Sequence, residues 1–137
     1  MKYYIFAILT SLLLAANVNA QSASKYQLSS HILDISAGHP ARNVQIELLK
    51  YDAEKSTWQK IDEGTTDQNG RITDFLPLTA NNDGIYKLKF LTKPYFDNLK
   101  QNSIYPFIEV VFEIEGKGHY HIPITVSANG YGTYRGN

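Results

Sequence analysis

The chain has 137 residues, no cysteine and a formal net charge of zero at pH 7. A chain of this length accommodates one domain, and the lack of cysteine excludes disulfides, thiolate metal ligands and a cysteine nucleophile. The neutral charge balance, with no basic run, excludes the electrostatic footprint of a nucleic-acid-binding protein. The sequence therefore predicts a small globular domain that depends on an ordinary apolar core or on oligomerisation.

The first 20 residues have the three parts of a secretory signal peptide. Lys2 supplies the positive start, an apolar run follows over 5–16, and small residues then offer a cleavage site before Gln21. The apolar run is short for a bilayer span and no second one follows, so a membrane anchor is the less favoured alternative. We expect residues 21–137 to form one exported domain, free of the membrane after cleavage, in the periplasm or the medium.

The rest of the chain has the pattern of β-strands. Apolar and polar residues alternate over 43–48 and again over 85–90, which is the period of a half-buried strand. Segment 107–114 is richer in β-branched and aromatic residues and indicates a central strand. A last strand is expected over 119–127, after a loop at 115–118 whose two glycines suit a hairpin.

Turn residues separate these strands, and one segment has a helical pattern. Residues 37–40 and 67–70 contain the types that accept turn geometry or positive φ. In 94–102 a proline stands early and Tyr95 shares a helical face with Leu99, which predicts one short helix. A single short helix among seven or eight strands favours an all-β fold, namely an antiparallel sandwich of two sheets.

The histidines are the first candidates for chemistry because they titrate near neutral pH. His119 and His121 stand two apart on the expected last strand, so their side chains point to one face. His31 lies on an expected first strand over 28–34, whereas His39 precedes a proline in a turn and is expected to be solvated. Taken singly, each of the three strand histidines is most simply an ordinary hydrogen-bonded residue.

A His-x-His pair with a third histidine elsewhere also fits a zinc site, whose catalytic form keeps three protein ligands. No Asp, Glu or Cys stands at typical ligand spacing near His119, so the signal is weak and we expect no metal.

The arginines are few, and two of them are candidates for binding an anion. Arg71 follows the Asn-Gly turn directly, and Arg135 lies close to the chain end. Arginine holds planar anions through two parallel hydrogen bonds, so arginines gathered with histidines would suit an anionic, planar, nitrogen-rich substrate.

Five motifs, taken in chain order, resemble those of the 5-hydroxyisourate hydrolases, the transthyretin-related enzymes of urate degradation. They span the whole mature chain and are Leu28–Asp34, Gly38–Ala41, Thr66–Arg71, His119–Pro123 and Tyr131–Gly136. The last of them is the most specific, because the Tyr-Arg-Gly ending separates these enzymes from the hormone-carrying transthyretins. The resemblance implies a two-sheet β-sandwich of transthyretin type with one short helix. It also implies a homotetramer with active sites in a channel at the dimer–dimer interface.

The resemblance further implies which residues act in hydrolysis of 5-hydroxyisourate to 2-oxo-4-hydroxy-4-carboxy-5-ureidoimidazoline. The implied catalytic residues are His31, Arg71 and His121, of which His31 and Arg71 also bind substrate. A histidine is a suitable base for activating water, since its pKa lies close to the operating pH. Arginine neutralises the substrate charge and the charge that develops on the attacked carbonyl. The chemistry needs neither a metal nor another cofactor.

The C-terminal tail is implied to complete this site. Tyr134 and Arg135 are expected to bind substrate, and His119 and Asn137 are expected to support the site without touching substrate. The family ends in serine where this chain has Asn137, which weakens any mechanism that needs the serine hydroxyl as a proton carrier. The alternatives are a non-enzymatic, transthyretin-like protein that binds a small ligand, although such carriers lack the histidines and the Arg-Gly ending, and a plain interaction module.

Overall fold

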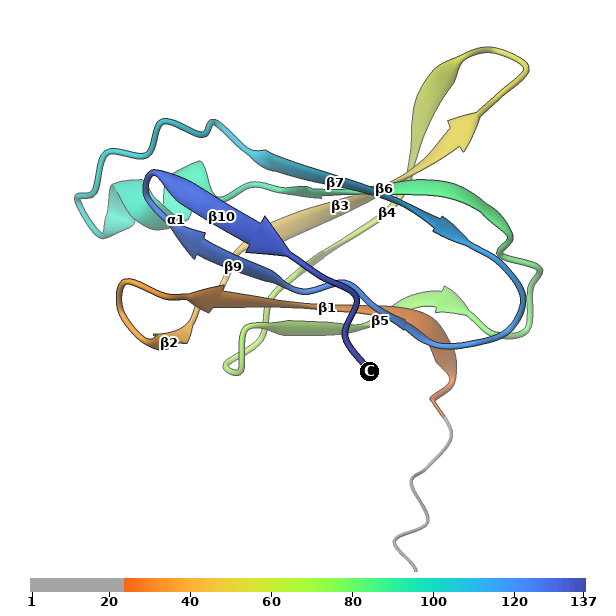
Figure 1. Ribbon diagram of the computed structural model, residues 1–137, viewed down its shortest axis with the longest axis horizontal. Helices are drawn as coiled ribbons and strands as arrows, with labels where there is room; N and C mark the ends of the chain where they lie inside the picture. The colour runs from red at the N-terminus through yellow and green to blue at the C-terminus, as the bar shows by residue number, and fades with distance from the viewer. Residues whose placement is uncertain (1–23) are drawn as a thin grey trace, which may run out of the picture.

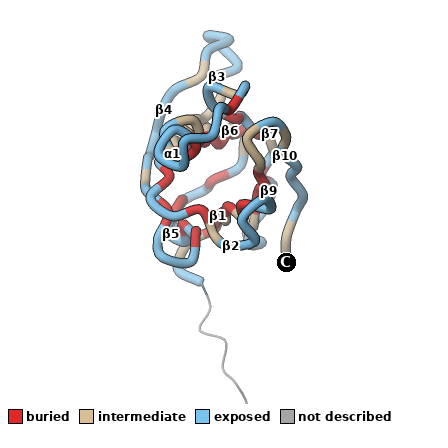
Figure 2. The backbone as a smooth tube through the Cα atoms, turned by 90° about the vertical axis from the view of Figure 1, so that its left-hand side faces the viewer, coloured by how far each residue is buried: buried red, intermediate tan, exposed pale blue. Residues whose placement is uncertain are grey.

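The computed structural model describes residues 24–137 and arranges them as two β-sheets packed face to face, with one short helix at one end (Figure 1). The predicted signal peptide, residues 1–20, lies outside the described residues. Within residues 24–137 no helix has the length and apolar character that a membrane crossing requires. The buried stretches of both sheets face each other between the two layers (Figure 2).

One sheet has four antiparallel strands in the order β4-β3-β6-β7. Their bounds are β3 Gln45–Asp52, β4 Thr57–Thr65, β6 Gly84–Phe90 and β7 Ile108–Ile114. The strands predicted over 43–48, 85–90 and 107–114 are thereby confirmed to within a few residues. Their apolar residues alternate because one face of the sheet covers the core, where Ile46, Leu48, Leu88 and Phe90 are fully buried.

The second sheet is built around β1, Tyr26–Asp34. Its other strands are β2 His39–Pro40, β5 Arg71–Pro77, β8 Tyr120–His121, β9 Ile124–Ser127 and β10 Gly130–Thr133. β5 and β2 pair with β1 antiparallel, whereas β8 and β9 run parallel to it, so the predicted antiparallel sandwich includes two parallel pairings. The strand predicted over 119–127 is interrupted at Pro123, which has no backbone N–H to donate to the ladder.

The loop at 115–118 does not form the predicted hairpin. β7 belongs to the four-stranded sheet, and the chain then crosses to the other sheet, where β8 runs parallel to β1. The buried side-chain amide of Gln27 holds this crossover by donating to the carbonyl oxygens of Gly116 at 2.7 Å and Gly118 at 3.1 Å. The hairpin prediction was therefore wrong, because the strands before and after this loop belong to different sheets.

The predicted helix is present but shorter than expected. Helix α1 spans Lys93–Asn98, with Pro94 in its first turn, and Phe96 is the residue that it buries completely. Leu99, expected on the same face as Tyr95, follows the helix and is exposed. Tyr95 packs edge-on against Phe96, with ring centroids 5.2 Å apart, and its hydroxyl donates to Asp34 Oδ2 of β1 at 2.9 Å, which ties the helix to the sheet.

Two turn glycines form a matched pair for testing how tightly the turn at 67–70 packs on β1. Gly70 has φ +70°, and a Cβ there would lie 2.7 Å from the Ile32 carbonyl oxygen. Gly38 has φ +71°, and a Cβ there would meet no other atom within 4 Å. We expect Gly38→Ala to lower the free energy of unfolding by about 1 kcal/mol, the ordinary cost of a left-handed residue.

Gly70→Ala should lower the free energy of unfolding by more, about 3 kcal/mol, because the backbone of β1 or of the turn must also move. Urea denaturation of both variants measures the difference. Equal losses in the two variants would contradict the close approach of the turn to β1.

Candidate active site

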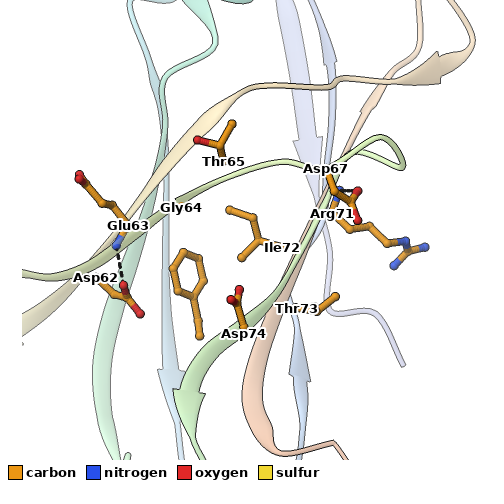
Figure 3. Close-up of a pocket in the computed structure, with 10 residues that line it drawn as sticks. Asp62, Glu63, Gly64, Thr65, Asp67, Arg71, Ile72, Thr73 and Asp74 are labelled. Carbon is orange, nitrogen blue, oxygen red and sulfur yellow. Dashed lines mark hydrogen bonds between the residues drawn. The ribbon is translucent and has the colours of Figure 1, made fainter.

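The pairing of β1 with β5 sets Arg71 beside His31, because these two residues are directly opposite each other in the ladder. Arg71 is among the residues that line a groove between β4 and β5, and its guanidinium extends away from Ile72 and Asp74 of that groove (Figure 3). The turn before Arg71 is fixed by Asp67, whose Oδ1 accepts hydrogen bonds from the backbone N–H groups of Asn69 at 2.8 Å and Arg71 at 2.9 Å. The Asn-Gly turn thus places Arg71 at the start of β5, opposite His31 on β1.

The parallel pairing of β1 with β8 sets His121 beside Ser29, two residues before His31. Because side chains alternate along a strand, Ser29 and His31 lie on the same face. The Ser29 hydroxyl oxygen lies 2.8 Å from Nδ1 of His121 and 2.9 Å from Nε2 of His119. One outer face of the sheet therefore carries an arginine, three histidines and a serine contributed by three strands and the residue before β8.

His31 is held in its neutral form. Burial lowers the pKa of His31 below its ordinary value of 6.5, and the neighbouring Arg71 guanidinium lowers this pKa further. A hydrogen bond with the Asn69 backbone and the charge of Asp67 act in the opposite direction without cancelling the effect. A neutral imidazole both donates and accepts, so His31 can serve either kind of group on a ligand.

The pKa of His121 is lowered as well. Burial contributes most, followed by the positive charge of Arg71 and by the two neighbouring histidines, His31 and His119. A hydrogen bond with the Ser29 backbone opposes the shift. His121 is thus unprotonated near neutral pH, which is the state a general base requires.

The C-terminal tail packs against His121 from another side. Figure 1 shows the tail leaving β10 and turning toward the β1 side of the sheet. The backbone N–H of Gly136 donates to the His121 carbonyl oxygen at 2.8 Å, which makes an isolated antiparallel bridge. A Cβ on Gly136 would lie 2.5 Å from Cδ2 of the His121 ring, so the close approach requires glycine.

The other two tail residues predicted at the site do not reach the histidines within one chain. The Arg135 guanidinium lies 4.5 Å from the ring centroid of Tyr120, which precedes His121 and points to the opposite side of β8. Arg135 and Tyr134 line a groove of about 300 Å³ together with Val110 of β7 and other apolar residues. Both tail side chains are exposed there.

The remaining predicted residues are placed as follows. His119 is exposed and is linked to His121 through the Ser29 hydroxyl, and Asn137 is exposed. His39 is exposed as predicted, although it lies on β2 and not in the turn that precedes this strand. In the part of the chain that the structure describes, no three His, Asp or Glu side chains gather as they would around a metal ion. Ser29 was missed, although its place two residues before His31 on a strand could have indicated that its hydroxyl shares the face of the site.

Comparison with known proteins identifies the family. The sequence profile of the HIUase/Transthyretin family matches residues 28–136, so the chain belongs to this family. The 5-hydroxyisourate hydrolase of Salmonella typhimurium is 39% identical over 138 residues, covering 100% of both chains. The structure of Klebsiella pneumoniae 5-hydroxyisourate hydrolase is similar with a TM-score of 0.69 and 31% identity, covering 80% of this chain and 98% of that one. The structure of sea bream transthyretin in complex with thyroxine is similar with a TM-score of 0.74 and 30% identity. This similarity covers 80% of this chain and 93% of the transthyretin chain.

Removing the charge of Arg71 should raise the pKa of both His31 and His121, because the guanidinium lowers both. Ring-proton NMR titration of Arg71→Gln measures the two values. Arg42→Gln is the matched control, since Arg42 also contacts the 67–70 turn, donating to the Gln68 carbonyl at 2.7 Å, but does not act on either histidine. Unchanged pKa values in Arg71→Gln would show that the guanidinium does not face the histidines.

Proposed function

We propose that the protein hydrolyses 5-hydroxyisourate to 2-oxo-4-hydroxy-4-carboxy-5-ureidoimidazoline, a step of urate degradation. The observation that carries the proposal is the meeting of His31, Arg71 and His121 on one sheet face, from three segments far apart in the sequence. A relative that is 39% identical from end to end is named 5-hydroxyisourate hydrolase, which supports the same assignment. The lowered pKa values of both histidines agree with a base that works near neutral pH.

In the proposed reaction His121 takes a proton from water, and the resulting hydroxide attacks a ring carbonyl carbon of the substrate. The ring C–N bond breaks, and the proton held by His121 passes to the leaving nitrogen, so the enzyme returns to its starting state. Arg71 holds the anionic substrate and the carbonyl oxygen on which negative charge develops. His31, beside Arg71 in the ladder, contacts the substrate and fixes its orientation.

The assembly is part of the proposal. We propose a homotetramer whose active sites lie in a channel between dimers, with Tyr134 and Arg135 contacting substrate once a neighbouring subunit lies against the tail. Support comes from the two edge strands β7 and β10, which leave Val111 58% and Tyr131 45% exposed, and from Tyr134, which is 59% exposed. Large apolar side chains exposed together on strand edges are typical of surfaces that associate.

Export is also proposed, with cleavage before Gln21 and activity in the periplasm or the medium. Its support is the tripartite character of residues 1–20.

A second candidate function is binding of a small ligand without chemistry. It is favoured by the similarity to sea bream transthyretin, which was solved with thyroxine bound, and by the mainly apolar groove beside Val110 and Arg135.

His121→Ala should lower the turnover of 5-hydroxyisourate by roughly two to four orders of magnitude, because it removes the base that is proposed to take the proton from water. The measurement is ultraviolet absorbance while urate oxidase oxidises urate, with and without the protein. His39→Ala is the matched control: its exposed ring hydrogen-bonds with the carbonyl oxygen of its neighbour Pro40, at 3.1 Å, and its loss should leave the rate unchanged. Unaccelerated decay with the wild-type protein, together with retained ligand, would identify a carrier instead.

Light scattering on the mature protein should give the mass of a homotetramer, because the exposed edges of both sheets need partners. Val111→Lys places a charge on the β7 edge and should shift the protein toward smaller species. Thr57→Lys, at the start of the opposite edge strand β4, is the control that should leave the mass unchanged. A fully active monomer would contradict both the assembly and a site shared between subunits.

A further inference from the structure

A single hydroxyl group links the two histidines of the His-x-His motif. The Ser29 side chain is buried, and its oxygen lies 2.8 Å from Nδ1 of His121 and 2.9 Å from Nε2 of His119. The other ring nitrogen of His119, Nδ1, lies 3.2 Å from the backbone carbonyl oxygen of Tyr26. These contacts form one continuous chain of hydrogen bonds from a backbone carbonyl to His121.

The chemistry of each group fixes the direction of the chain. A carbonyl oxygen only accepts, so Nδ1 of His119 carries its hydrogen and donates to Tyr26. A neutral imidazole has one N–H, which leaves Nε2 of His119 as an acceptor for the Ser29 hydroxyl. That hydroxyl has one hydrogen, so toward His121 its oxygen only accepts. Nδ1 of His121 must therefore be the donor.

The result for His121 is a single tautomer. With its one hydrogen on Nδ1, the neutral ring has a free lone pair on Nε2. Nε2 is bonded to Cδ2, the ring atom against which Gly136 packs. The ring is thus held from both sides, by a hydrogen bond at Nδ1 and by the tail beside the unprotonated nitrogen.

We infer that Ser29 is a positioning residue which, with His119 behind it, holds His121 as the Nδ1–H tautomer, so that Nε2 is the atom that takes the proton from water. The role of the water rests on the proposed function, whereas the tautomer does not. When Nε2 gains a proton, the ring becomes a cation and its Nδ1–H bond to Ser29 strengthens, because hydrogen bonds from charged donors are stronger. That proton later leaves from Nε2 to the leaving nitrogen, and the hydrogen on Nδ1 stays in place throughout.

The direct test is NMR of the protein labelled with ¹⁵N in its histidines, since ring nitrogen shifts show which nitrogen carries hydrogen. We expect His121 and His119 both to carry it on Nδ1. Ser29→Ala should let His121 populate both tautomers, and Ser29→Thr, which keeps the hydroxyl, should restore the Nδ1–H form. A wild-type His121 protonated on Nε2 would overturn the inference whatever the activity.

Ser30→Ala is the matched control. The Ser30 hydroxyl is also buried on β1, but it points to the opposite face and donates to the Ile122 carbonyl at 2.8 Å. Its loss should lower the melting temperature while leaving the His121 tautomer as in the wild type. A tautomer change in Ser30→Ala equal to that in Ser29→Ala would mean that loosening of β1, and not the hydroxyl link, is responsible.

Kinetics give an independent readout. Ser29→Ala should lower kcat roughly 10-fold to 100-fold with little change in KM, because both the tautomer and the orientation of the His121 ring are released. Ser29→Thr should recover most of that loss. An unchanged kcat in Ser29→Ala would overturn the role of Ser29 in the reaction. A wild-type protein that shows the Nδ1–H tautomer but no hydrolysis would instead overturn the proposed function and leave the positioning of His121 standing.

Discussion

The backbone ladder of β1 determines where each candidate catalytic group lies. β1 pairs with β5 on one side and with β8 on the other, so Arg71 and His121 are each fixed about one strand spacing, ~4.8 Å, from it. Along this strand, residues of the candidate site alternate with residues of the core: Ser29 and His31 face outward, whereas Leu28 and Ile32 are fully buried. A slip of one residue would exchange the two sets, so the apolar core that stabilises the fold also holds the catalytic register.

Within that register, one cation serves two needs. Arg71 is the group suited to hold an anionic substrate, and its charge also lowers the pKa of both neighbouring histidines. In the proposed reaction, the unprotonated state of the base and the attraction of the anionic substrate would thereby depend on the same guanidinium. The nearby Asp67 carboxylate, whose Oδ1 accepts hydrogen bonds from the backbone N–H groups of the turn, opposes the lowering of the His31 pKa without cancelling it.

Much of this could be predicted from sequence because it depends on local pattern. The alternation over 43–48 and 85–90 located two strands, and the motifs around His31, Arg71 and His121 indicated residues that the structure then brings together. The features that sequence analysis predicted wrongly or missed depend on contacts between residues that are distant in the chain. The crossover at 115–118 is held by Gln27, and no periodicity reveals that the Ser29 hydroxyl lies between two histidines about 90 residues later.

The contact between Gly136 and His121 has a consequence for how the protein is made. Gly136 follows all the described strands and buried core residues in the sequence, so it leaves the ribosome after they have been synthesised. Folding of the core and completion of the site are therefore separable events, and the second comes later. A chain trimmed by a carboxypeptidase keeps its apolar core covered and would pass a protease that detects unfolded protein, yet it lacks the backbone that holds His121. An affinity tag fused after Asn137 would likewise begin one residue from that contact.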